Sequence, residues 1–151
     1  MANSQAMCTS FKTQILSGVH ALGTTVTRGS TAADSLKAAL YLESASLGAG
    51  TTVYSASGEV SGTNYTAGGV AVTNATAPTS SGTTAYWTPS ASFTFTNVTL
   101  STSFDAVLVY NSTQGDKAIS VHTFGAQTVT AGNFVLSMPT NDASNALLRI
   151  A

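Results

Sequence analysis

The 151-residue sequence contains very little charge. Charged residues make up 7% of the chain, with five Lys or Arg against six Asp or Glu. Average soluble proteins carry roughly a quarter of their residues as charged side chains. The five basic residues are scattered, so the chain has no basic cluster that could neutralise nucleic-acid phosphates. We therefore expect no nucleic-acid partner.

Cysteine and histidine are almost absent as well. The single cysteine, Cys8, excludes an internal disulfide, and no Cys/His pair has the spacing of metal ligands. Cys8 follows Met7 and is expected to be a small buried apolar side chain. We expect no metal and no cofactor.

Groups of acids, bases and nucleophiles are also missing from the sequence. The acids Glu59, Asp105, Asp116 and Asp142 are too scattered to predict a glycosidase pair or a calcium loop. His122 could be combined with Asp105 and one of the many serines, but the abundance of serine makes that combination uninformative. We expect His122 to be a hydrogen-bonded or surface strand residue, and the protein not to be an enzyme.

No apolar run approaches the ~18–20 residues that a membrane-spanning helix needs, so we expect no membrane partner. The first five residues are polar and Lys12 interrupts the more apolar residues after them, unlike the pattern of a secretory signal peptide. We expect the chain to be made in a cytosol and not exported.

Threonine, serine, asparagine and glycine supply the polarity instead. Small hydroxyl side chains cost little to dehydrate, and identical copies with such surfaces repel one another weakly. Residues 70–99 hold no charge at all, although isolated β-proteins usually protect their edge strands with charges. This pattern favours a homo-oligomer or a larger assembly.

Residues 104–111 form the most apolar strand-like stretch. Phe104 and Leu108 would point to one face, with Asp105 and Val107 on the other, and both faces carry apolar side chains. This pattern predicts a central strand covered on both sides. The turn at residues 112–116 lets residues 118–124 fold back as a hairpin.

Short strands with frequent turn signals fill the rest of the chain. We expect a single domain over residues 1–151, in which residues 35–151 form an all-β antiparallel sandwich or jelly roll. Residues 74–84 are expected to be an exposed loop. The remaining predicted strands cover residues 35–42, 70–73, 85–88, 93–98, 128–130, 133–138 and 146–150. Residues 51–54 are expected to be a short extended piece, and residues 100–103 lead into the central strand.

One helix is predicted, over residues 5–22, with Ser4 as its N-cap and Gly23 as its stop. An apolar stripe recurs every four residues along it. This stripe either packs on the protein's own sheet or docks on a partner subunit. Its members are Met7, Phe11, Ile15 and Val19.

Two further sites carry candidate contact residues. Glu59 and Tyr65 lie on a glycine-rich loop over residues 58–69, which is either a fixed turn that covers a core edge or a loop that binds a ligand or partner. Tyr86 and Trp87 are adjacent aromatics that either fill a core or hairpin position or offer a flat surface to a glycan.

Four segments together resemble small virion structural proteins of tailed bacteriophages, most closely the capsid cement or decoration proteins. They are MANSQAMCTSFK (1–12), LKAALY (36–41), EVSGTNYTAGG (59–69) and FDAVLVYN (104–111). The resemblance implies a compact jelly roll on the outer capsid surface that binds neighbouring major capsid proteins and other copies of itself. It implies no catalysis and supplies no residue list. The alternative is a tail or fibre-associated protein that contacts a host glycan through Tyr86 and Trp87.

Overall fold

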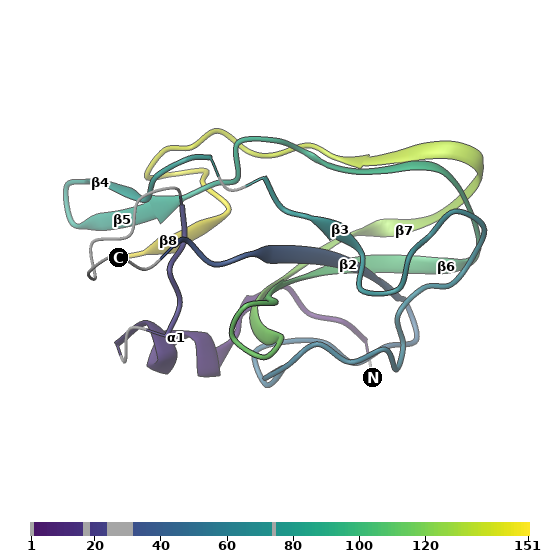
Figure 1. The fold of residues 1–151 in the computed structure, drawn as a ribbon, viewed down its shortest axis with the longest axis horizontal. Coiled ribbons are helices and arrows are strands. Elements are labelled where there is room, and N and C mark those ends of the chain that lie inside the picture. The colour runs from purple at the N-terminus through teal and green to yellow at the C-terminus, as the bar shows by residue number, and fades with distance from the viewer. Residues whose placement is uncertain (1, 17–18, 24–31, 74) are drawn as a thin grey trace.

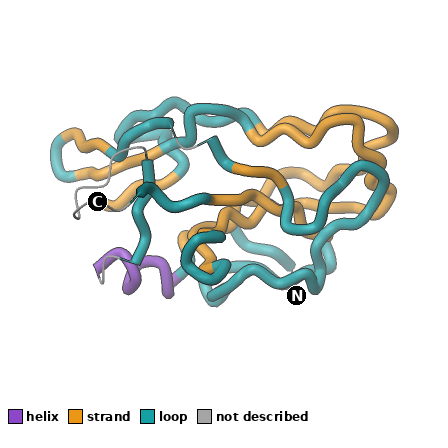
Figure 2. The backbone as a smooth tube through the Cα atoms, viewed as in Figure 1, coloured by secondary structure: helices purple, strands orange, loops and turns teal. Residues whose placement is uncertain are grey.

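The computed structural model describes residues 2–16, 19–23, 32–73 and 75–151, and their strands pair antiparallel in two sheets (Figures 1 and 2). The larger sheet has the order β1-β7-β6-β2-β3, and the smaller one the order β4-β5-β8. The expected all-β sandwich with one N-terminal helix is confirmed. The elements are β1 (Ala6–Met7), α1 (Thr9–Leu16), β2 (Leu36–Leu42), β3 (Val70–Ala71), β4 (Thr79–Ser81), β5 (Thr84–Trp87), β6 (Phe93–Asn111), β7 (Lys117–Leu136) and β8 (Leu148–Ile150).

The predicted central strand is the second half of β6. It lies between β2 and β7 in the larger sheet, and both neighbours pair with it along residues 106–111. Phe104 and all residues from 106 to 111 are buried, so both faces are covered, as the apolar residues on both faces predicted. The one charge on this stretch, Asp105, accepts a hydrogen bond from Asn3 Nδ2 at 2.6 Å.

The hairpin of β6 and β7 builds both layers of the sandwich. The sequence predicts separate strands at residues 93–98, 128–130 and 133–138. In the structure the first is part of β6, which has 19 residues, and the other two are parts of β7, which has 20. The pairing shifts register repeatedly between Phe95 and Ala106, and Figure 1 shows the ribbon curling over itself there. Bulges of this kind bend and twist a strand pair. The far half then covers the near half, with the Phe134 ring 4.9 Å from that of Phe104.

The helix is shorter than predicted. Residues 6–7 are paired with β7, and the Cys8 amide still donates to the Ile119 carbonyl at 3.0 Å, so the helix begins at Thr9. Ser4 is therefore not its N-cap; the Ser4 amide donates to the Leu47 carbonyl instead. The helix ends at Leu16, and residues 17–18 lie outside the described part of the chain.

The loop predicted at residues 74–84 is partly strand. Thr79–Ser81 pairs with Thr84–Trp87 as a tight hairpin, and all three residues of β4 are exposed, as expected for this excursion. Asn74 lies outside the described residues. The sequence did not predict β4, because its exposed Ser and Thr residues show no alternation of apolar and polar side chains.

Candidate contact surfaces

The apolar stripe of the N-terminal segment faces the protein's own core. Phe11 is 1% exposed, and its ring meets the His20 ring edge-on with centroids 4.8 Å apart. Met7 and Ile15 are partly buried against the same core. Val19 is partly exposed and follows the end of the helix. Phe11 is therefore a core residue rather than an interface residue.

A polar network, which the sequence did not predict, fastens this segment to the central strand. The buried Asn111 side chain donates to Asp34 Oδ2 at 2.7 Å and lies 3.0 Å from His20 Nδ1. Gln114 and the Ala21 amide also donate to the Asp34 carboxylate. Burial raises the pKa of Asp34, but these hydrogen bonds outweigh it and hold that pKa below its ordinary value. Burial lowers the pKa of His20.

Glu59 and Tyr65 are brought together in the structure. The Glu59 side chain is 9% exposed, and its Oε1 accepts hydrogen bonds from the Tyr65 hydroxyl and the Gly68 amide, both at 2.8 Å. Oε2 accepts from the Tyr54 hydroxyl at 2.6 Å. Three donors thus surround one buried carboxylate, which satisfies it without a cation. We call Glu59, Tyr54, Tyr65 and Gly68 the Glu59 knot.

Backbone contacts join the Glu59 knot to the sheet. The Val60 amide donates to the Leu40 carbonyl at 3.0 Å, and the Leu40 amide donates to the Tyr65 hydroxyl at 3.0 Å. Burial, with the Glu59 carboxylate beside them, raises the pKa of both Tyr54 and Tyr65. Both phenols therefore remain protonated donors at neutral pH, and the knot is fixed. The sequence marked Glu59 as a rare acid but did not identify Tyr54 as its partner.

The knot displays an exposed, uncharged loop. Residues 61–67 are exposed except for Tyr65, whose ring stacks on Phe95 at 5.8 Å. Asn64 has a φ of 60° and donates through Nδ2 to the Asn97 carbonyl at 2.8 Å. Thr63 forms an antiparallel bridge with Thr99. The loop is thus tied to β6 at two points and held open to solvent.

Tyr86 and Trp87 do not form a common aromatic surface. Trp87 is 2% exposed, and its Nε1 donates to the Thr76 carbonyl at 2.8 Å. Tyr86 is partly exposed and precedes Trp87 on the same strand, so the two side chains point to opposite faces. The expectation of two surface aromatics is wrong for Trp87, which is a core residue.

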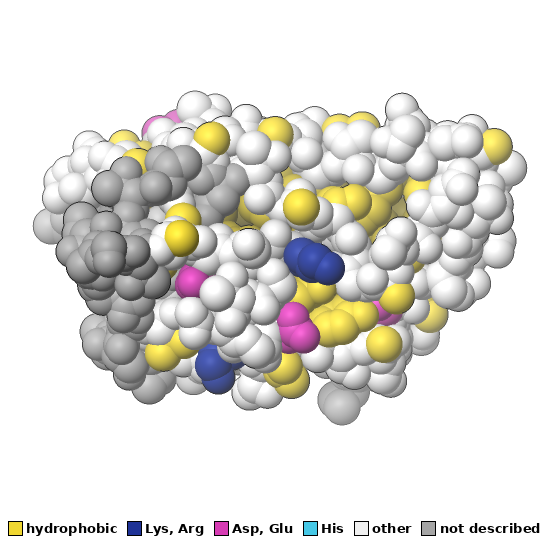
Figure 3. All heavy atoms as spheres, in the orientation of Figure 1, with side chains coloured by type: hydrophobic (Ala, Val, Ile, Leu, Met, Phe, Trp, Pro, Cys, Tyr) yellow, Lys and Arg dark blue, Asp and Glu magenta, His cyan; other side chains and the backbone are white. Residues whose placement is uncertain are grey.

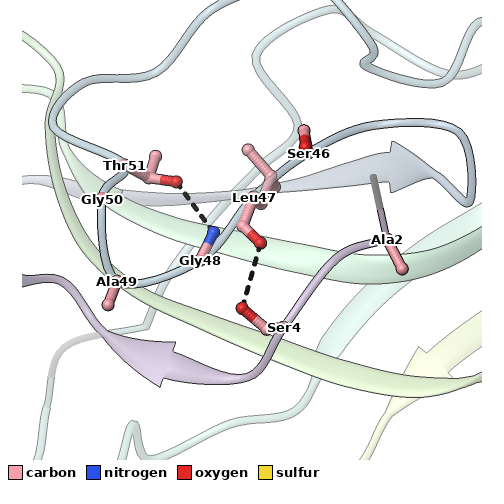
Figure 4. Close-up of a pocket in the computed structure, with 8 residues that line it drawn as sticks. All are labelled: Ala2, Ser4, Ser46, Leu47, Gly48, Ala49, Gly50 and Thr51. Atoms are coloured by element: carbon pink, nitrogen blue, oxygen red, sulfur yellow. Dashed lines mark hydrogen bonds between the residues drawn. The ribbon is translucent and has the colours of Figure 1, made fainter.

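A shallow hollow of about 370 Å³ lies between the N-terminal segment and the loop at residues 46–51 (Figure 4). Thr51 Oγ1 accepts from the Gly48 amide at 3.0 Å, and Ser4 Oγ donates to the Leu47 carbonyl at 3.4 Å. The hollow is lined by Ala2, Ser4, Ser46, Leu47, Gly48, Ala49, Gly50 and Thr51. None of these side chains is an acid or a base.

The chemistry-bearing residues are dispersed. Ser120 Oγ lies 2.9 Å from His122 Nε2, and burial lowers the pKa of His122 to about 4. Burial raises the pKa of Cys8 to about 11, which keeps it a thiol. In the described ranges no three His, Cys, Asp or Glu side chains gather as metal ligands, and no helix there is long and apolar enough to cross a membrane.

Comparison of the chain with protein-family models, with curated proteins and with solved structures finds no match.

Proposed function

We propose that this chain is a structural protein of a tailed-bacteriophage virion, namely a capsid cement or decoration protein. It is made in the host cytoplasm and binds the outer capsid surface, where it holds neighbouring major capsid proteins together without catalysing a reaction. The observation that carries the proposal is the uncharged surface that the fold displays. Every exposed residue within 61–67, 93–103 and 125–137 is uncharged, and most are Ser, Thr, Asn or Gly. The face drawn in Figure 3 likewise shows few charged side chains.

Such a surface suits binding to a lattice of identical subunits. Desolvating a hydroxyl that regains a hydrogen bond costs far less than desolvating a charge. Neighbouring copies with a net charge of -1 each repel one another weakly. Many shallow contacts, repeated over a lattice, then add up through multivalency.

The Glu59 knot supports the same proposal, because it makes the displayed loop rigid before any partner arrives. Ordering a loop on binding costs roughly 0.5–1.5 kcal/mol for each immobilised side chain. The ties of Asn64 to Asn97 and of Thr63 to Thr99 fix residues 61–67 in advance. A surface that is already ordered loses less of its interaction energy when it binds.

The test compares virions that lack this chain with virions that contain it. We expect the particles without it to release their DNA at a lower temperature, and the purified chain to restore the lost stability when it is added back. If the deficient particles are as stable as the complete ones and fail at adsorption to the host, a tail or fibre role replaces this proposal.

A further inference from the structure

The strand β7 has a long outer edge that nothing in the described part of the chain covers. β7 pairs with β6 along its length, but with β1 it pairs only at Ser120 and Val121. Over residues 122–136, no second strand or backbone hydrogen bond from another described segment meets this edge. The outward amides and carbonyls there are a template for another strand.

This edge also lacks the usual protection against pairing with another chain. No Asp, Glu, Lys or Arg occurs between Lys117 and Asp142, and no proline occurs between Lys117 and Pro139. Burial lowers the pKa of His122 to about 4, so this side chain adds no charge at neutral pH. Natural edge strands are normally blunted by charges or proline. An unprotected edge of this length indicates that a strand covers it in the working protein.

Apolar side chains accompany the open edge. Phe124 on the near half of β7 and Phe134 on the far half have ring centroids 5.4 Å apart, and both are only partly buried. Leu136 is also partly buried, and Val135 is 48% exposed. A strand added here would gain backbone hydrogen bonds and would cover part of this apolar surface.

We propose that the outer edge of β7 at residues 132–136 pairs antiparallel with the same segment of a second copy of this chain, about a two-fold axis. The last three residues of the segment, Phe134, Val135 and Leu136, keep an unshifted register with β6. An antiparallel edge is complementary to itself, as an interface with two-fold symmetry requires. The uncharged sequence places no like charges opposite each other when two copies meet. This proposal does not depend on capsid binding.

The experiment measures the mass of the full chain in solution by sedimentation equilibrium. We expect the wild-type protein to have twice the 15.2 kDa mass of one chain. Pairing residues 132–136 with themselves sets Val135 opposite Asn133 of the second copy, so the two Val135 side chains are diagonal neighbours across the two-fold axis. Val135→Lys and Val135→Glu each place like charges at these diagonal positions, and both variants should sediment with the mass of one chain. Val53→Lys is the matched control, because Val53 is 47% exposed and lies outside β7; this variant should keep the wild-type mass.

Mixing the two Val135 variants tests self-pairing directly. Lysine on one copy then lies diagonally across the axis from glutamate on the other, and we expect the doubled mass to return. A wild-type protein that sediments as one chain overturns the proposal, as does a Val135→Lys variant that keeps the doubled mass. Ile150, on β8, is 47% exposed; if Ile150→Lys dissociates the protein and Val135→Lys does not, the pairing edge is β8 and the proposal is wrong.

Discussion

Removing the Glu59 carboxylate should destabilise the fold far more than removing an exposed acid. In the Glu59→Ala variant, the Tyr65 hydroxyl and the buried Gly68 amide lose the acceptor that each now reaches at 2.8 Å. A stranded buried donor costs about 1–3 kcal/mol. Tyr54 is only partly buried, so the loss at its hydroxyl is expected to be smaller. Together these terms predict a loss of about 3–5 kcal/mol in the free energy of unfolding, a large share of the ~5–15 kcal/mol of a typical domain.

The Glu59→Gln variant separates charge from hydrogen bonding. Its amide oxygen can still accept from Tyr65 and Gly68, and the Tyr54 hydroxyl can rotate to accept from the amide nitrogen. We therefore expect about half the loss of Glu59→Ala, since hydrogen bonds to charged groups are roughly twice as strong as neutral ones.

Urea unfolding followed by the fluorescence of Trp87 measures these losses, because Trp87 is the single tryptophan and is 2% exposed. Glu43→Ala is the control. Glu43 is exposed and accepts one hydrogen bond, from Ser103 Oγ at 2.9 Å, so its loss should stay within about 0.5 kcal/mol. A Glu59→Ala variant that loses no more stability than Glu43→Ala would refute the role given to the Glu59 knot.

Burial and backbone geometry give three further predictions. His122 has a folded-state pKa of about 4 against 6.5 for the free side chain, so the unfolded chain binds a proton first. The free energy of unfolding should therefore fall by up to about 3 kcal/mol as pH drops from about 6.5 to 4. Urea unfolding over this range should show a clearly smaller fall for His122→Gln, and an unchanged fall would contradict the lowered pKa of His122. Phe11→Ala should cost about 3–5 kcal/mol by urea unfolding, since Phe11 is 1% exposed, and a cost below 1 kcal/mol would show that Phe11 is not core. Gly69→Ala should lower the free energy of unfolding by well over 3 kcal/mol in thermal unfolding, because a Cβ there would lie 1.9 Å from the Ala38 carbonyl oxygen at a φ of +72°. Gly82→Ala, which has a similar φ and open space around it, should lose about 1 kcal/mol, and equal losses in the two variants would contradict the clash.

The sequence was most informative where side-chain pattern alone decides the structure. Residues 104–111 carry apolar side chains on both faces, and such a stretch is stable only when both faces are covered. In the structure both faces are covered, and the strand lies between β2 and β7; the turn at residues 112–116 sets the hairpin. Residues 36–42 are also a strand that the sequence predicted, and five of the seven are buried.

The bend of the long hairpin could not be predicted in this way. A bulge adds a residue to one strand without a distinctive side-chain pattern, so residues 93–98 and the central strand at 104–111 were predicted as two strands instead of one that turns a corner. The helix was predicted too long because the residues at positions 7 and 19 fit a helical period. In the structure the Cys8 amide donates to the Ile119 carbonyl, which keeps the residues before Thr9 extended.

The candidate contact residues show the same limit. Glu59 stood out because acids are rare, yet its partner Tyr54 lies five residues away on irregular backbone, where spacing carries no geometric meaning. For Trp87 the sequence left a core position and a glycan surface both open; its indole is buried and donates to a backbone carbonyl, which decides for the core. Asp34 and Asn111 are 77 residues apart, and tertiary structure alone brings them together.

An electron cryomicroscopy map of the intact virion tests the proposed function most directly. We expect density for this two-layer β-fold on the outer capsid surface, in contact with neighbouring major capsid proteins. A map that places the fold in the tail or its fibres, or that shows no copy of it in the particle, would contradict the proposal.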